Sequence, residues 1–164
     1  MWFAALACAL GCSLASGQDA QLPAAGVRID VRIPGGRVST FAAADLARLP
    51  RTVVRAEERG GSTAAYEGPA IGSLLAQAGV ALGKDAHGPD FVRVVIVVGS
   101  DGYRAVFSLP ELDSSFTDGV VILADRRNGS PLEAKDGPYR LIVGADRRPT
   151  RWVRNVTGIE VLAP

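Results

Sequence analysis

The sequence predicts a single α+β domain in which mixed β-structure dominates. Its 164 residues, 48% hydrophobic and 21% charged, are ordinary for a globular chain and sufficient for one hydrophobic core. Short apolar runs separated by Gly and Pro outnumber helical patterns by about seven to two. The 19 Gly and 10 Pro are scattered without a repeat, which excludes collagen-like and low-complexity classes.

Strands are expected wherever apolar and polar residues alternate or β-branched residues form short runs. Residues 27–33 alternate, and residues 91–98 form an almost unbroken β-branched run before Asp101-Gly102, a strong hairpin signal. In chain order the expected strands cover residues 27–33, 37–41, a stretch that begins at Thr52, 91–98, 103–109, 120–124, 139–143 and 153–161, which Gly158 interrupts. Turns are expected at residues 34–36, 60–61 and 127–129.

Two helices are expected. Leucines at helical spacing predict the first over residues 42–49, with Thr40 as its N-cap and Pro50 as its end. Apolar residues at i, i+3, i+4 and i+7 predict the second over residues 71–79, and Gly79 stands where a helix C-cap is expected.

The N-terminus predicts export. Residues 2–16 are apolar or small and carry no charge, which is typical of a signal peptide and too short for a membrane span. We expect a signal peptide over residues 1–17, cleaved after Ala15 or Gly17, and a periplasmic or secreted protein whose domain covers residues 27–162. Cys12 loosely matches a lipoprotein cleavage box, and we favour simple cleavage over lipidation.

Cysteine and histidine are scarce. Cys8 and Cys12 lie within the expected signal peptide, and His87 is the only histidine. Zinc-finger, cysteine-protease, Ser-His-Asp and iron–sulfur classes are therefore excluded.

Basic residues gather in the second half of the chain. Residues 126–154 contain eight basic and three acidic side chains. Arg126 and Arg127 lie at one expected turn and Arg147, Arg148 and Arg151 at another, so the two turns are candidates for holding a phosphate or a carboxylate. The alternative is a solvated face in an arginine-rich chain. Nucleic acid is not expected, because the net charge is only +1 and no row of aromatics accompanies the basic residues.

Four more residues are candidates for binding a flat ligand. Tyr103 and Trp152 are candidates for stacking, and Asp101 and Asp125 follow apolar strands, where each carboxylate can accept hydrogen bonds from a heterocycle. The alternatives also stand: a turn residue for Asp101 and a core position for Trp152. No glycine-rich nucleotide motif is present in the sequence.

The order of several motifs resembles the molybdopterin-binding domain of the sulfite oxidase superfamily. In chain order the motifs are LARLPR at 46–51, YEGPAIGSLLAQAG at 66–79, SDGYRAVFSLPEL at 100–112, VILAD at 121–125, NGSPL at 128–132, DGPYRLIV at 136–143 and RWVRNV at 151–156. The resemblance spans roughly residues 27–162. It implies a mixed α+β domain in which a pterin cofactor lies across loops at strand ends, with its phosphate held by basic residues.

One departure from the family concerns the metal. The resemblance implies a molybdenum-ligating cysteine shortly after the Leu-Pro-Arg motif, but residues 54–60 read VRAEERG, and no cysteine follows Cys12. Glu57 and Glu58 are not equivalent soft ligands. A pterin or molybdopterin ligand is therefore expected without molybdenum.

Three functions follow from the resemblance. The favoured one is an exported, non-catalytic pterin- or molybdopterin-binding protein that serves the periplasmic domain of a membrane signalling protein. The second is a molybdopterin-dependent oxidoreductase of the sulfite oxidase type, which the missing cysteine disfavours. The third is a vestigial domain that binds only protein.

Overall fold

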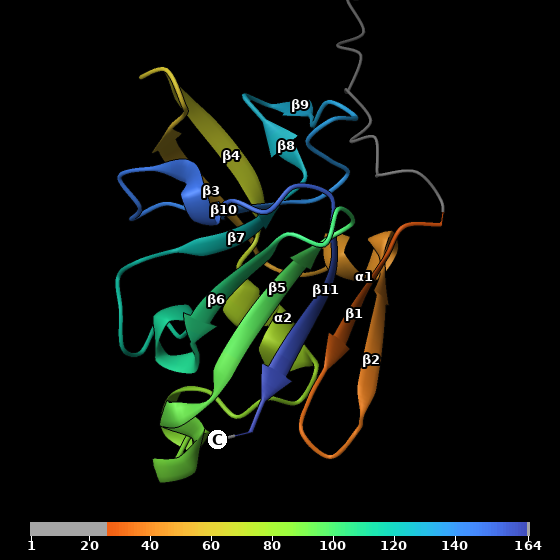
Figure 1. Ribbon diagram of the computed structural model, residues 1–164, viewed down its shortest axis with the longest axis vertical. Helices are drawn as coiled ribbons and strands as arrows, with labels where there is room; N and C mark the ends of the chain where they lie inside the picture. The colour runs from red at the N-terminus through yellow and green to blue at the C-terminus, as the bar shows by residue number, and fades with distance from the viewer. Residues whose placement is uncertain (1–25, 164) are drawn as a thin grey trace, which may run out of the picture.

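The computed structural model describes residues 26–163, which form one sheet-rich domain with few helices, as the sequence predicts (Figure 1). The elements in chain order are β1 (Arg28–Arg32), β2 (Val38–Ala42), α1 (Ala43–Ala47), β3 (Arg51–Glu57), β4 (Thr63–Pro69), α2 (Ile71–Gln77), η1 (Gly83–Asp85), η2 (Gly88–Val92), β5 (Val94–Gly99), β6 (Arg104–Ser108), η3 (Leu109–Leu112), β7 (Val121–Ala124), β8 (Arg126–Arg127), β9 (Ser130–Pro131), β10 (Arg140–Val143), η4 (Pro149–Arg151) and β11 (Val156–Leu162), where η marks a 3-10 helix.

The largest sheet has five strands in the order β2-β1-β11-β5-β6. β1 and β11 run parallel, and the other neighbours run antiparallel, so the sheet is mixed. The expected hairpins β1–β2 and β5–β6 are both present. Alternation in β1 has the expected effect, because Ile29 and Val31 are fully buried while their neighbours face outward.

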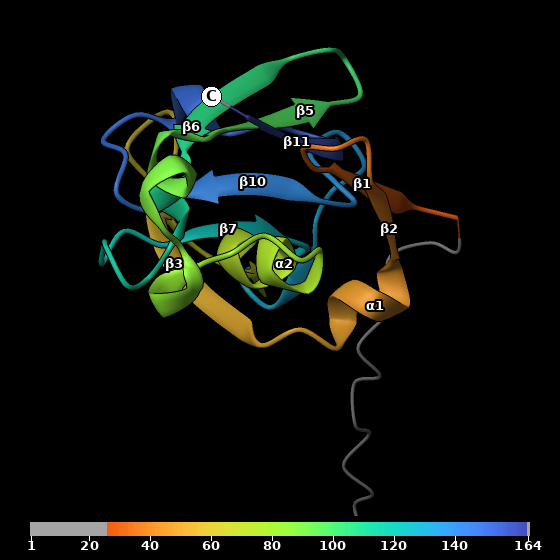
Figure 2. The same ribbon diagram turned by 90° about the horizontal axis from the view of Figure 1, so that it is seen from below.

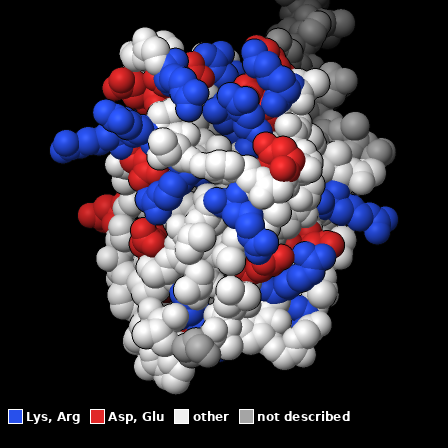
Figure 3. Space-filling view, viewed as in Figure 1, with Lys and Arg blue, Asp and Glu red and all other residues white. Residues whose placement is uncertain are grey.

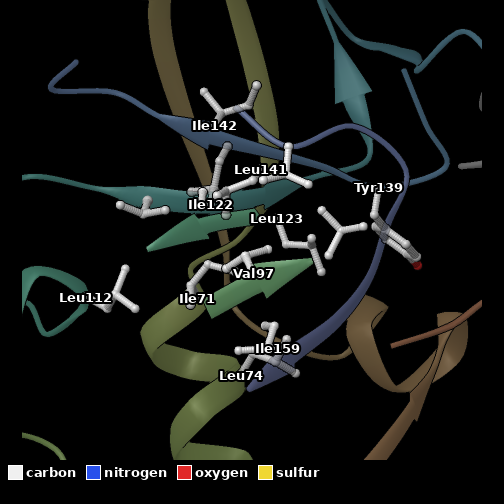
Figure 4. Close-up of a cluster of buried hydrophobic side chains, with 14 of the residues drawn as sticks. Ile71, Leu74, Val97, Leu112, Ile122, Leu123, Tyr139, Leu141, Ile142 and Ile159 are labelled. Atoms are coloured by element: carbon white, nitrogen blue, oxygen red, sulfur yellow. The ribbon is translucent and has the colours of Figure 1, made fainter. Parts of the chain in front are cut away.

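The core lies between this sheet and α2 (Figure 2). The antiparallel pair β7 and β10 runs through it, and seven of the eight residues of these two strands are buried. A strand covered on both faces shows an unbroken apolar run in its sequence, which is why VILA and LIV are strands without alternation. Figure 4 shows Ile122, Leu123 and Leu141 from this pair near Leu74 of α2 and Ile159 of β11.

A four-stranded sheet, β3-β4-β8-β9, forms the end of the molecule at the top of Figure 1. β4 passes close to β7 at Gly68, where a Cβ would lie 2.1 Å from the Leu123 carbonyl oxygen, so only glycine fits. β8 and β9 are joined by Asn128 and Gly129, both with positive φ, as a tight hairpin turn requires. The expected turn at 127–129 is therefore shorter, because Arg127 belongs to β8.

Local expectations fail where side chains cap the backbone. Residues 88–92 form the 3-10 turn η2, so the strand expected over 91–98 begins only at Val94; the Asp90 carboxylate accepts the His87 N–H at 2.9 Å. The first helix is shorter than 42–49, and Thr40 is not its N-cap. Thr40 donates to Asp30 within the β1–β2 pair, and the Asp45 carboxylate accepts the Ala42 N–H instead.

Two more differences concern strands. β4 was not expected, because Gly68 and Pro69 obscure its pattern of polar and apolar residues. The last strand begins at Val156 rather than at residue 153, and the register shifts between Val156 and Gly158, the glycine that interrupts the sequence pattern.

The expected signal peptide and Cys12 lie outside the described residues. Within residues 26–163, none of the helices combines the length and the apolar character needed to cross a membrane.

Candidate functional site

Two adjoining cavities open near the four-stranded sheet, and we call them together the paired cavity. The first has a volume of about 320 Å³ and the second about 490 Å³, and Glu58, Arg59, Arg140 and Arg154 line both. Figure 3 shows Lys and Arg side chains gathered at this end of the molecule, with acidic side chains among them. Cavities of this size accommodate small organic ligands.

The two parts of the paired cavity differ in chemistry. The first part adds an aromatic and polar wall, made of Asp101, Tyr103, Pro149, Thr150 and Trp152. The second part is mainly polar and charged, and it adds Arg127, Asn128, Ser130, Pro131, Leu132, Glu133, Lys135 and Asp136. The arrangement therefore suits a ligand with a flat ring at one end and an anionic group at the other.

Glu58 anchors the wall that the two parts share. Its carboxylate accepts two hydrogen bonds from Arg127, at 2.8 Å from Nε and 2.6 Å from a terminal nitrogen, and one from the hydroxyl of Tyr66. The Arg127 hydrogen bonds lower the pKa of Glu58 to about 2. Burial, followed by the bond to Glu58, raises the pKa of Tyr66 to about 12, so both groups hold fixed charge states at neutral pH.

Arg140 lies deeper in the same wall. Its side chain is 12% exposed, and its guanidinium carbon lies 5.3 Å from the Trp152 ring centroid and 6.0 Å from that of Tyr66. The Asp136 carboxylate lies 3.3 Å from Arg140 and 3.0 Å from Nε of Arg154. One carboxylate thus lies beside two guanidinium groups, and both Arg140 Nε and Asp136 Oδ1 are buried without a hydrogen-bond partner among the described residues. Two guanidinium groups against one carboxylate leave one positive charge in this group that an anion can neutralise.

Three of the candidates from the sequence line the first part of the paired cavity: Asp101, Tyr103 and Trp152. One Asp101 carboxylate oxygen accepts the Tyr103 N–H at 2.9 Å, so Asp101 is also the turn residue that the alternative named. Trp152 is 5% exposed and packs edge-on against Tyr66, so it belongs both to the core and to the cavity wall.

Asp125 and Arg126 have partners within the protein. Asp125 accepts two hydrogen bonds from the Arg51 guanidinium, at 2.5 and 3.1 Å, and Arg51 also donates to Glu67. Arg126 donates to the carbonyl of Gly129 within the β8–β9 turn. Neither residue lines the paired cavity.

The second arginine cluster also lies outside the paired cavity. Arg147 and Arg148 are exposed, and Arg151 is bound to Asp146 and Glu111. The two turns do approach the same cavity, but they do so through Arg127 on one side and Pro149 and Thr150 on the other.

Of the two arginines at the first expected turn, Arg127 lines the cavity and Arg126 does not. Several other cavity residues were not candidates from the sequence: Glu58, Arg59, Lys135, Asp136, Arg140 and Arg154. Their signal was weak, because each is one charged residue in a chain with 18 basic and 17 acidic side chains. Arg140 lies both in the basic stretch 126–154 and in a motif that resembles the family, and neither pattern singles out its side chain.

These features identify a class of protein. A family model described as "oxidoreductase molybdopterin binding domain" matches residues 21–163, and the chain belongs to that family. The fold resembles that of the sulfane dehydrogenase SoxCD from Paracoccus pantotrophus, with a TM-score of 0.64 and 20% sequence identity. The match covers 82% of this chain and 38% of that chain, so this protein spans well under half of that relative. A search of curated proteins gives no match.

The cavity lining offers groups for a flat heterocycle but no soft ligand for a metal. The family resemblance implies a protein thiolate as a molybdenum ligand, and no cysteine follows Cys12 in the sequence. Glu58, next to the expected cysteine position, is engaged by Arg127 and Tyr66. Within residues 26–163, no group of three or more His, Cys, Asp or Glu side chains is arranged to hold a metal ion. By contrast, the aromatic wall and the guanidinium groups fit a flat heterocycle with an anionic substituent.

Proposed function

We propose that this protein is an exported, non-catalytic binding protein for a pterin, or for molybdopterin without its metal. The observation that carries the proposal is the paired cavity, with aromatic and carboxylate groups in one part and guanidinium groups in the other. Family membership supplies the ligand class.

The ring of the pterin belongs in the first part of the cavity. Tyr103 is 48% exposed and offers a face for stacking. The second Asp101 carboxylate oxygen is left to accept hydrogen bonds from the amino and ring N–H groups of a pterin. Trp152 closes the wall behind the ring.

The anionic substituent belongs near Arg59, Arg140 and Arg154. Arg59 is exposed and makes no ion pair with any described residue, and the other two share Asp136. Guanidinium groups bind phosphate and carboxylate through paired hydrogen bonds. A pterin with a phosphate ester should therefore bind here more tightly than a pterin with a neutral substituent.

The donor set supports a binding role rather than oxygen-atom transfer. A carboxylate that already accepts hydrogen bonds from an arginine and a tyrosine does not replace a thiolate ligand. Family membership favours the second candidate, a molybdopterin-dependent oxidoreductase. Without a cysteine after Cys12, that candidate requires that the cofactor alone, or a partner protein, supplies the ligands of the metal.

The decisive experiment is to release the bound small molecules. The full chain is expressed in a bacterium that makes the molybdenum cofactor, purified and denatured, and the supernatant is measured for pterin fluorescence, mass and molybdenum. Pterin without molybdenum supports the binding protein. Pterin with one molybdenum per chain supports the oxidoreductase. If the sample contains neither pterin nor molybdenum, the vestigial protein-interaction domain is favoured.

The proposal also includes export to the periplasm and a membrane signalling protein as the partner. The uncharged apolar residues 2–16 support removal of a signal peptide and a location in the periplasm, where a sensory domain of a membrane signalling protein is within reach. The intact mass of protein recovered from the periplasm tests cleavage near residues 15–17. A cross-linked membrane partner that appears only with pterin-loaded protein would support the signalling role, and a pterin-independent partner would refute it.

A further inference from the structure

Arg151 is the best-connected cation of the segment that follows β10. Its Nε and one terminal nitrogen donate to the two oxygens of Asp146 at 2.9 and 2.7 Å, and the other terminal nitrogen donates to Glu111 at 3.3 Å. Its guanidinium carbon lies 4.6 Å from the ring centroid of Phe107 on β6. We call this group the Arg151 clamp.

The segment that the clamp holds has few other ties. Over residues 144–151 the backbone bonds are mostly local, such as Thr150 N–H to Arg148 O at 2.8 Å. The ties to other elements are the Gly144 N–H to Val120 O at 3.1 Å and the Tyr103 hydroxyl, which donates to Thr150 O at 2.5 Å. A segment with so few backbone bonds depends on its side chains for its position.

This segment forms one wall of the paired cavity. Pro149 and Thr150 line the first part, and Trp152 follows directly. On the other side, the Arg151 side chain closes a separate cavity of about 80 Å³ together with Phe107 and Glu111. Arg151 therefore faces away from the paired cavity while its neighbours face into it.

We propose that Arg151 is a positioning residue, which fixes residues 144–151 against β6 and η3 and so sets the wall that Thr150 and Trp152 present to the ligand. The inference rests on the proposed function, because the affected wall is that of the pterin cavity. It assigns Arg151 a role different from direct contact with an anionic ligand, the role expected from the sequence.

The substitution Asp146→Asn distinguishes the two roles, because they predict opposite changes in the affinity for an anionic pterin. If Arg151 bound the anion, freeing it from Asp146 would strengthen binding of an anionic pterin. If Arg151 is a clamp, the loss of two charge-assisted hydrogen bonds loosens the wall, and binding weakens for neutral and anionic pterins alike. The probes are neopterin and neopterin monophosphate, titrated by quenching of tryptophan fluorescence.

We expect Asp146→Asn and Arg151→Met each to weaken the binding of both probes by about tenfold, and we expect the double variant to weaken binding no further. The matched control is the pair Glu160→Gln and Arg104→Met, which breaks an ion pair on the outer face of the sheet that contains β6. This control should leave both affinities unchanged. Tighter binding of the monophosphate by Asp146→Asn, or a loss in Arg151→Met confined to the monophosphate, overturns the proposal.

A ligand-free measurement keeps the inference testable if the protein binds no pterin. We expect hydrogen exchange at the Thr150 and Trp152 amides to be about tenfold faster in Asp146→Asn than in wild type, with no change in Glu160→Gln. Unchanged exchange refutes the clamp. If wild type binds neither probe but hydrogen exchange is faster in Asp146→Asn, the proposed ligand is refuted and the role of the Arg151 clamp is supported.

Discussion

Replacement of Glu58 by glutamine tests the network at the centre of the paired cavity. Glu58 accepts hydrogen bonds from Arg127, from the hydroxyl of Tyr66 and, at 3.2 Å, from the hydroxyl of Ser62. Glutamine keeps the shape of the side chain but removes the charge and turns one acceptor into a donor. Arg127 then loses its ion pair, and the Tyr66 hydroxyl competes for a single remaining oxygen.

The expected cost lies between that of a surface ion pair and that of a buried one. The Glu58 side chain is 19% exposed and that of Arg127 is 40% exposed. Exposed pairs contribute about 0–1 kcal/mol, and breaking a buried pair costs about 3–5 kcal/mol, so we expect a loss of about 2 kcal/mol in the free energy of unfolding at pH 7. For a domain of this size that lowers Tm by about 6–8 °C.

The lowered pKa of Glu58 also predicts how the stability difference between wild type and Glu58→Gln changes with pH. The pKa of Glu58 is about 2 in the folded state against 4.5 for the free side chain, so between these values the unfolded chain binds more protons. The contribution of Glu58 is present above about pH 4.5 and is lost as the pH falls toward about 2. The stability gap between wild type and Glu58→Gln should therefore narrow over that interval.

Urea unfolding followed by circular dichroism, at several pH values from 2 to 7, provides the measurement. Glu57→Gln is the matched control, because Glu57 is an exposed neighbour without an ion pair among the described residues, and we expect it to leave stability unchanged. A gap that stays constant with pH, or no loss at pH 7, would refute the assignment of Glu58 as the anchor.

Three further predictions concern the site and its support. Arg140→Met should weaken binding of neopterin monophosphate by at least about tenfold in a fluorescence titration, because an arginine–phosphate contact is lost; equal affinity with the Arg104→Met control would contradict the anion site. Arg51→Met should lower the free energy of unfolding in urea by about 2–3 kcal/mol, because Asp125, whose side chain is 10% exposed, keeps a charge without its partner; an unchanged midpoint would show that the pair contributes nothing. Gly68→Ala should cost about 1–3 kcal/mol or more, since its Cβ would overlap a β7 carbonyl, and thermal unfolding equal to wild type would contradict that close approach.

Strands that depend on local pattern were predictable from the sequence. β1 followed from alternation and β2 from the turn at residues 34–36, and β5 and β6 followed from a β-branched run and an Asp-Gly turn. These signals lie within a few residues of each other, so they survive in any tertiary context. β4 and η2 were missed, because Gly68 and Pro69 obscure the strand pattern of β4 and a side-chain cap at Asp90 turns the start of an apparent β-branched run into η2.

The family was also accessible from the sequence, because the order of its motifs runs along most of the chain. The absence of a cysteine after Cys12 is likewise a property of the sequence alone, and it restricts the chemistry of the site whatever the fold. Asp101, Tyr103 and Trp152 were candidates because each is a distinctive residue beside a strand pattern, and all three line the paired cavity.

Only the tertiary structure decided what each arginine does. Arg140 and Arg151 are alike as residues in a basic stretch, yet one lines the paired cavity and the other is held by Asp146 and Glu111 outside it. The role of a guanidinium group is set by the carboxylates within reach, and the fold brings Glu111 to Arg151 from 40 residues away. The sequence alone determined the type of domain and the missing thiolate, whereas the pairing of charges, and with it the position of the cavity, depended on contacts between segments far apart in the chain.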